Sequence, residues 1–126
     1  MNEELCKLQK NIVKKYKLQK RIEIVHNKIQ NVPDVVTSAN VIIINNAFEM
    51  YISEDEQIDT WQLLKKNTKK GTIMVTNPPL EVTFKNLKIE IVLEDWVKPY
   101  KLNEDVDDSM NLDKFLYSDI ALYQVL

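Results

Sequence analysis

The chain has 126 residues, of which 44% are hydrophobic and 29% are charged, and its formal net charge is −2. One cysteine, Cys6, excludes an intramolecular disulfide and a cysteine zinc cluster, and one glycine, Gly71, excludes any glycine-rich phosphate-binding motif within these residues. Because no run approaches the roughly 20 apolar residues of a membrane span, we expect one soluble domain over residues 1–126, in the cytoplasm or nucleus and without a membrane partner.

The N-terminal segment, residues 2–17, is predicted to form an amphipathic helix whose apolar stripe faces a core. Residues 21–25 alternate enough to predict a short strand, and His26, the only histidine, begins the loop after it. A structural role is the simpler interpretation of a lone histidine, and no second histidine or cysteine cluster predicts a metal site. The residues of the stripe are Leu5, Leu8, Ile12, Val13 and Tyr16.

The most apolar stretch of the chain is residues 41–44, four β-branched residues that end on Asn45 and Asn46. A run this short and apolar predicts a strand at residues 40–46 that is covered on both faces, at the centre of a parallel sheet. A helical turn at residues 33–37 is predicted before it. In open parallel sheets, ligands bind beyond the carboxyl ends of the strands, which places the two asparagines at the candidate site.

The strongest helix signal begins at Ser53, which forms a capping-box pattern with Glu56. Lysines gather before Gly71, as expected where a helix ends. The predicted buried face consists of Ile58, Trp61 and Leu64.

The C-terminal half is predicted to contain strands at residues 72–76, 87–97 and 120–126, with an acidic loop at 101–113. The sequence Asn77-Pro78-Pro79 is interpreted as a rigid turn that closes the first of these strands. Together the elements predict an α/β fold with a mostly parallel sheet and a C-terminal antiparallel strand pair.

This order of elements resembles the C-terminal two-thirds of a class I S-adenosylmethionine-dependent methyltransferase, a Rossmann-like fold whose sheet is mostly parallel and ends in an antiparallel hairpin. The stretch Asn45-Asn46-Ala47-Phe48 is similar to the asparagine-rich signature of non-SET histone-lysine methyltransferases, which lines the methionine end of the cofactor and the lysine channel. The sequence Lys69-Lys70-Gly71, followed by a β-branched strand, is similar to the entry into that family's fifth strand. The segments that carry the resemblance are residues 3–18, 21–25, 39–48 and 69–76.

The resemblance implies S-adenosylmethionine as cofactor and an amine, favoured as a protein lysine, as methyl acceptor. Such a transfer mainly requires that the reactants be positioned and the nucleophile stripped of its proton and water. Asn45 and Asn46 are candidate catalytic and cofactor-binding residues. A carboxamide can accept a hydrogen bond from an incoming amine and donate another one elsewhere, without a charge that would trap the nucleophile. Glu49 is a candidate proton acceptor, and Phe48 and Tyr51 are candidate pocket walls. The simpler alternatives are a capped strand end for the asparagines and a solvated carboxylate for Glu49.

The resemblance leaves out the family's glycine-rich loop and the acidic residue that holds the ribose. By position, His26 and Asn27 are candidate cofactor-binding residues near the adenine, although Lys28 is a poor acceptor for the adenine amino group. The strands that would lie between residues 21–25 and 40–46 are absent, which leaves unpaired strand edges. To explain the missing strands, we expect that the chain is a fragment, which would bind the cofactor weakly or not at all. The alternatives are a sheet closed by rearrangement, self-association through the unpaired edges, and a superficial resemblance.

A non-enzymatic interaction module is the competing interpretation. Residues 1–33 carry eight Lys or Arg against three Glu, and residues 94–119 carry eight acidic residues against three Lys. A solvated basic helix and an acidic loop explain this pattern most simply, and a basic surface that binds a protein or nucleic-acid partner is the alternative.

Overall fold

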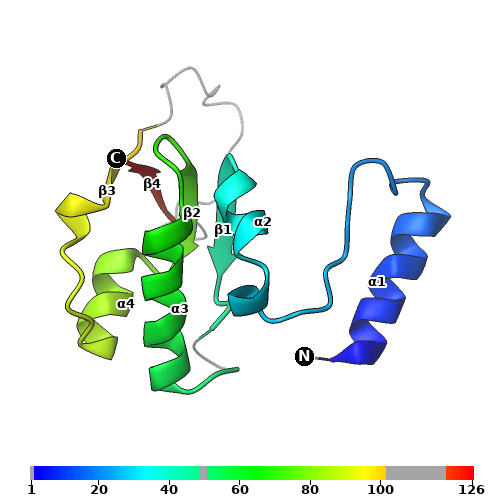
Figure 1. Cartoon of the computed structure of the whole chain (residues 1–126), viewed down its shortest axis with the longest axis horizontal. Helices are drawn as coiled ribbons and strands as arrows, with labels where there is room; N and C mark the ends of the chain where they lie inside the picture. Colours follow the sequence, from blue (N-terminus) through cyan, green and yellow to red (C-terminus); the bar gives the residue numbers. More distant parts are fainter. Residues whose placement is uncertain (1, 49–50, 102–118) are drawn as a thin grey trace. The chain divides into compact units, whose positions relative to one another are not determined.

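The structure is a computed structural model that describes residues 2–48, 51–101 and 119–126. It contains two compact units, Met1–Val32 and Pro33–Leu126 (Figure 1). In the described part of the chain, no helix combines the length and the apolar character that crossing a membrane requires.

The N-terminal unit is built on helix α1 (Glu3–Lys15), which confirms the predicted helix. Asn2 caps the helix, because its Oδ1 accepts hydrogen bonds from the N–H groups of Glu4 and Leu5 at 3.0 and 3.2 Å. Acidic residues lie in the first turn and lysines in the last, which suits the helix dipole.

Within the N-terminal unit, the apolar stripe of α1 is largely exposed, so this unit does not itself supply the core that the stripe is predicted to face. Cys6 and Val13 are buried, but Leu5 is 56% exposed and Tyr16 is 63% exposed. Residues 1–32 therefore leave most of the apolar face of α1 uncovered.

The strand predicted at residues 21–25 is wrong. These residues have no regular structure, and the next element is the short 3₁₀ helix η1 (Ile29–Asn31). A strand needs a neighbouring strand to pair its backbone groups, and no strand among the described residues is paired with this segment. Alternation in the sequence therefore reflected local composition and not burial on one face of a sheet.

The C-terminal unit is α/β, as predicted, and contains a four-stranded mixed sheet in the order β1-β2-β4-β3. β1 pairs with β2 in parallel, and β4 is antiparallel to both of its neighbours, so β1, β2 and β3 run in one direction and β4 runs against them. One of the three pairings is therefore parallel, and "mostly parallel" does not describe this sheet. The strands are β1 (Val41–Asn45), β2 (Ile73–Asn77), β3 (Val97–Pro99) and β4 (Ala121–Val125).

Helices α3 and α4 lie on one face of the sheet (Figure 1), and α2 contacts α3. The Oγ of Ser53 accepts from the N–H of Glu56 at 3.3 Å, which confirms the predicted start of α3. The helix ends at Asn67, before Gly71, whose φ of +87° turns the chain into β2. The helices of this unit are α2 (Pro33–Ser38), α3 (Glu54–Asn67), α4 (Leu80–Leu87) and the 3₁₀ helix η2 (Leu93–Asp95).

Aromatic rings from α3, α4 and the loops form the centre of the core. Trp61 meets Phe48 edge-on with ring centroids 5.5 Å apart, and meets Phe84 at 5.4 Å. Phe84 in turn stacks on Trp96 at 6.3 Å. Leu64, an aliphatic residue on the same helix as Trp61, is fully buried as well.

In the described sheet β1 is an edge strand, so the prediction of a central strand covered on both faces is wrong for the part of the chain that the structure describes. Ile44 is buried on the side of the helices, but Val41 and Ile43, on the opposite face, are 55% and 71% exposed. Because side chains alternate along a strand, a layer of helices on one face buries only every second residue. In the described structure, the apolar run at residues 41–44 therefore does not mean that both faces of β1 are covered.

The strand predicted at residues 87–97 is also wrong. α4 ends at Leu87, Lys88 adopts a left-handed conformation with φ of 54°, and only β3 follows as a short strand. The predicted terminal strand is confirmed as β4. It pairs antiparallel with β3, as an antiparallel C-terminal pair requires, but β3 shares only Val97 with the strand predicted at residues 87–97. The predicted acidic loop lies outside the described residues except for Lys101.

Candidate functional site

Three asparagine side chains meet where β1 and β2 end. The parallel register places Asn45 opposite Asn77, and the Oδ1 of Asn45 accepts from the Nδ2 of Asn77 at 3.0 Å and from the Nδ2 of Asn46 at 3.3 Å. The backbone N–H of Asn46 also donates to the carbonyl of Asn77 at 2.7 Å. We call these three residues the carboxamide cluster.

The local backbone explains why asparagines suit this position. Asn46 has a φ of 46°, in the left-handed region that asparagine tolerates better than most residues. This conformation ends β1 and leaves the side chains of Asn45 and Asn46 exposed, while Asn77 is half-buried. The cluster therefore lies at a surface that a ligand can reach.

The cluster retains hydrogen-bonding capacity. Among the described residues, the Nδ2 of Asn45 and the Oδ1 of Asn77 have no partner. A carboxamide nitrogen donates and a carboxamide oxygen accepts, so the cluster offers both functions without a net charge.

Two hollows adjoin the carboxyl end of β2. The first, of about 370 Å³, lies between the start of α3 and helix α4 and is lined in part by Gln57, Pro78 and Thr83. The second, of about 90 Å³, is mainly apolar and is lined in part by Asn45, Asn77 and Ile120. The cluster thus borders one hollow directly, and Pro78, next to Asn77 in the chain, lines the other.

Asn77 is the member of the cluster that sequence reasoning missed. The turn predicted for Asn77-Pro78-Pro79 is present, with a cis bond between Asn77 and Pro78, and it leads directly into α4. A signal was available in the sequence, because the carboxyl ends of neighbouring parallel strands meet at one edge of a sheet and each of these strands ends in asparagine.

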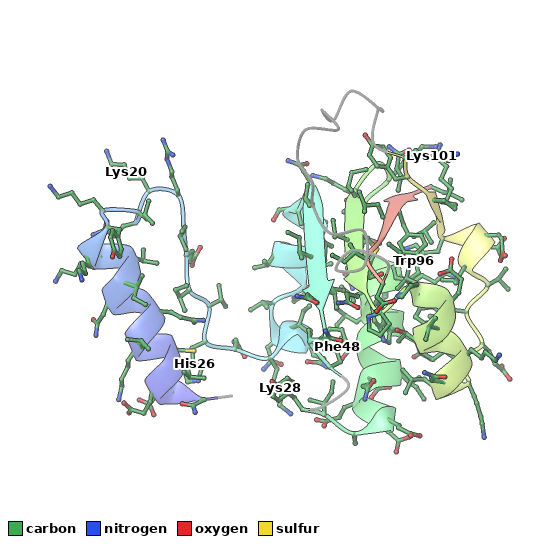
Figure 2. The ribbon with its side chains drawn as sticks, turned by 180° about the vertical axis from the view of Figure 1, so that it is seen from behind. Lys20, His26, Lys28, Phe48, Trp96 and Lys101 are labelled. Carbon is green, nitrogen blue, oxygen red and sulfur yellow. The ribbon has the colours of Figure 1, made fainter. Side chains whose placement is uncertain are left out.

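Two of the predicted cofactor-binding residues belong to the N-terminal unit. His26 is exposed on the loop after α1 (Figure 2). The side-chain oxygen of Asn27 is engaged by neighbouring residues, because its Oδ1 accepts hydrogen bonds from the N–H of Lys28 and from the Nδ2 of Asn31, both at 2.9 Å. Within their unit, these residues build a turn.

The remaining predicted residues follow β1. Phe48 is half-buried and directs its ring edge-on at Trp61, so it packs into the core of the unit (Figure 2). Tyr51 is exposed, and Glu49 lies outside the described residues. The described structure therefore brings Asn45 and Asn46 together with Asn77, but shows no wall formed by Tyr51.

A second polar group lies in the interior beside α4. The hydroxyl of Tyr123 donates to the carboxylate of Glu81 and accepts from the N–H of Leu80 at 3.1 Å. Burial raises the pKa of Tyr123 well above its usual range, and the hydrogen bond to Glu81 raises it further. This contact ties the start of α4 to β4 and serves the fold.

In the described residues, no group of three or more His, Cys, Asp or Glu side chains is arranged to hold a metal ion. Comparison with known protein families, with curated proteins and with solved structures finds no match to this chain.

Proposed function

We propose that this chain carries part of a methyltransferase site, in which the carboxamide cluster positions a methyl-accepting amine against S-adenosylmethionine. The observation that carries the proposal is the meeting of Asn45, Asn46 and Asn77 at the carboxyl ends of two adjacent parallel strands. This is the edge at which open α/β sheets bind ligands.

The chemistry of the cluster fits this task. S-adenosylmethionine, when bound, supplies an electrophilic methyl group on a sulfonium. The unpartnered Oδ1 of Asn77 is available to accept from the N–H of an amine, and the Nδ2 of Asn45 is available to donate to a polar ligand atom. Because neither group is charged, the amine keeps its lone pair for the new N–C bond. The amine proton leaves to solvent.

The fit covers one end of the cofactor only. Gly71 is the single glycine of the chain, and it lies in the turn before β2 and not at the carboxyl ends of the strands. We therefore expect the isolated chain to bind S-adenosylmethionine weakly. The favoured acceptor, a protein lysine, follows from the similarity of residues 45–48 to an asparagine-rich signature.

Chemical-shift mapping tests the site. On titration of the ¹⁵N-labelled chain with S-adenosylmethionine, we expect the side-chain amide signals of Asn45, Asn46 and Asn77 to shift together, without saturation at micromolar ligand. Asn45→Ala removes the shared acceptor and should abolish the shifts at the other two residues. Gln62→Ala, which removes an exposed carboxamide on α3, is the matched control and should leave the titration unchanged.

Two results would contradict the proposal. Unchanged cluster signals at millimolar ligand would show that the asparagines do not form a cofactor site. Shifts that persist in Asn45→Ala would place binding elsewhere. A calorimetric titration that gives micromolar affinity would overturn the expectation of weak binding by this chain alone.

A second candidate function, docking of a protein partner on α1, is favoured by the apolar stripe of that helix, which its own unit leaves exposed. Leu8 and Ile12 lie on this stripe and are exposed, and exposed lysines flank it. An amphipathic basic helix of this kind is suited to an acidic groove lined with apolar residues.

Two sets of substitutions separate the possible partners of α1. Reversing charge at Lys10, Lys14 and Lys17 should abolish partner binding and leave the melting temperature unchanged, because all three side chains are exposed. Leu8→Ser with Ile12→Ser should also abolish binding to a protein. If only the charge reversals matter, and affinity falls steeply with salt, the partner is a nucleic acid and the proposal of a protein groove fails.

A further inference from the structure

We propose that the free edge of β1 pairs with β1 of a second copy of this chain, in an antiparallel arrangement that joins two sheets into one. β1 is the terminal strand of the described sheet and pairs with β2 on one side only. Proteins usually block such edges with charged residues, proline or bulges. Residues 39–47 contain no charge and no proline, and the register with β2 runs without interruption from Val41 to Asn45.

The hydrogen bonds to β2 show which backbone groups of β1 are free. The carbonyl of Asn40 accepts from Ile73 at 3.0 Å, and the N–H of Asn46 donates to Asn77 at 2.7 Å. In a parallel pair, alternate residues direct both backbone groups toward the neighbouring strand. Residues 40, 42, 44 and 46 therefore face β2. The N–H and C=O groups of residues 41, 43 and 45 point outward, without a partner among the described residues.

This pattern is complementary to itself. When two β1 strands run antiparallel with Ile43 opposite Ile43, residue 41 of each copy lies opposite residue 45 of the other. All three opposed pairs then exchange both of their hydrogen bonds, which is the arrangement of hydrogen-bonded pairs in an antiparallel ladder. No outward-facing group of β1 is left unpaired, which favours a second copy of the same strand as the occupant.

The side chains support the same register. Val41 and Ile43 project from the face of β1 that carries no helix, and they are 55% and 71% exposed. Directly opposed residues of an antiparallel pair share a face, so the two copies of Ile43 would cover each other. A pairing of two short strands is a small interface, and interfaces below about 1,200 Å² are typical of weak association. We therefore expect a dimer that dissociates on dilution.

Sedimentation equilibrium over a concentration series tests the association. The mass of the full chain should rise from one copy toward two as its concentration increases. Ile43→Lys should hold the mass at one copy, because two ammonium groups would face each other across the symmetry axis. The exposed position of Ile43 lets the monomer accept lysine without loss of core packing. Val82→Lys, at an exposed site on α4, is the matched control and should associate like the natural chain.

Cysteine cross-linking tests the register in a Cys6→Ser background. Ile43→Cys should form an inter-chain disulfide rapidly, because the opposed Cα atoms would lie about 5.5 Å apart, within the range that a disulfide spans. Val41→Cys lies on the same exposed face, but its two copies would be separated by four residues along the strand, about 13 Å, which is too far to bridge. It should therefore cross-link slowly.

The proposal fails if the natural chain stays monomeric throughout the series, or if Ile43→Lys associates as the natural chain does. Equal cross-linking of Val41→Cys and Ile43→Cys would overturn the register. These results leave the methyltransferase proposal untouched, because that proposal depends on the asparagine side chains and not on the edge backbone of β1.

Discussion

At the scale of single residues, hydrogen-bonding capacity decides which polar side chains belong to a site. Asn27 uses its oxygen within a local turn, whereas the cluster at Asn45 keeps a free donor and a free acceptor among the described residues. Tyr123 is the opposite case, because its hydroxyl both donates and accepts inside the protein. A buried group whose hydrogen bonds are satisfied contributes to stability and is not available to a ligand.

Replacing Tyr123 by phenylalanine tests this structural role. Tyr123→Phe removes the acceptor for the N–H of Leu80 and the donor to Glu81, so the free energy of unfolding should fall by about 1–2 kcal/mol near neutral pH. Chemical denaturation followed by tryptophan fluorescence measures this loss. Tyr16→Phe, at an exposed position of α1, should change stability by less than about 0.5 kcal/mol.

The pH dependence of this difference has a definite sign. The pKa of Tyr123 is higher in the folded protein than in the unfolded chain. The folded state therefore holds its proton where the unfolded state releases it, and the contribution to stability is lost as pH rises above the ordinary tyrosine value of about 10. The difference in the free energy of unfolding between the natural protein and Tyr123→Phe should therefore become smaller above that pH. A constant gap would contradict a raised pKa.

At the scale of elements, the sequence predicted best where local chemistry alone sets the structure. The capping residue Ser53, the acidic first turn and the lysine-rich end placed α3, and the apolar runs placed β1 and β2. The predictions failed where a long-range partner decides the structure. Among the described residues, the segment 21–25 has no neighbouring strand, and helices cover only one face of β1.

Helix α4 shows why its segment could not be predicted from alternation. Its start is fixed by a contact from Tyr123, far away in the sequence, and its end by a left-handed Lys88, where glycine or asparagine would have given a signal. The site was predicted in part for the same reason. Asn45 and Asn46 stand beside the strongest apolar run, whereas Asn77 joins them only through the register of two strands.

At the scale of the whole chain, the core is unevenly divided between the two compact units. Among the described residues, Cys6 and Val13 are the buried apolar side chains of the N-terminal unit, and the other buried apolar side chains belong to Pro33–Leu126. The carboxamide cluster and the free edge of β1 also belong to the second unit. Both of the functions proposed for this unit therefore depend on a sheet whose core is supplied by residues 33–126.

This division predicts that the second unit folds without the first. A variant that begins at Pro33 should unfold cooperatively, because Trp61, Leu64 and Met74 are almost completely buried among elements of their own unit. Trp61 and Trp96 are the two tryptophans of the chain and lie in that core, so their fluorescence reports its unfolding directly. The full chain is the reference, and Trp61→Phe in both lengths confirms the origin of the signal. A broad, non-cooperative transition in the shortened protein would show that residues 1–32 are needed to complete the core.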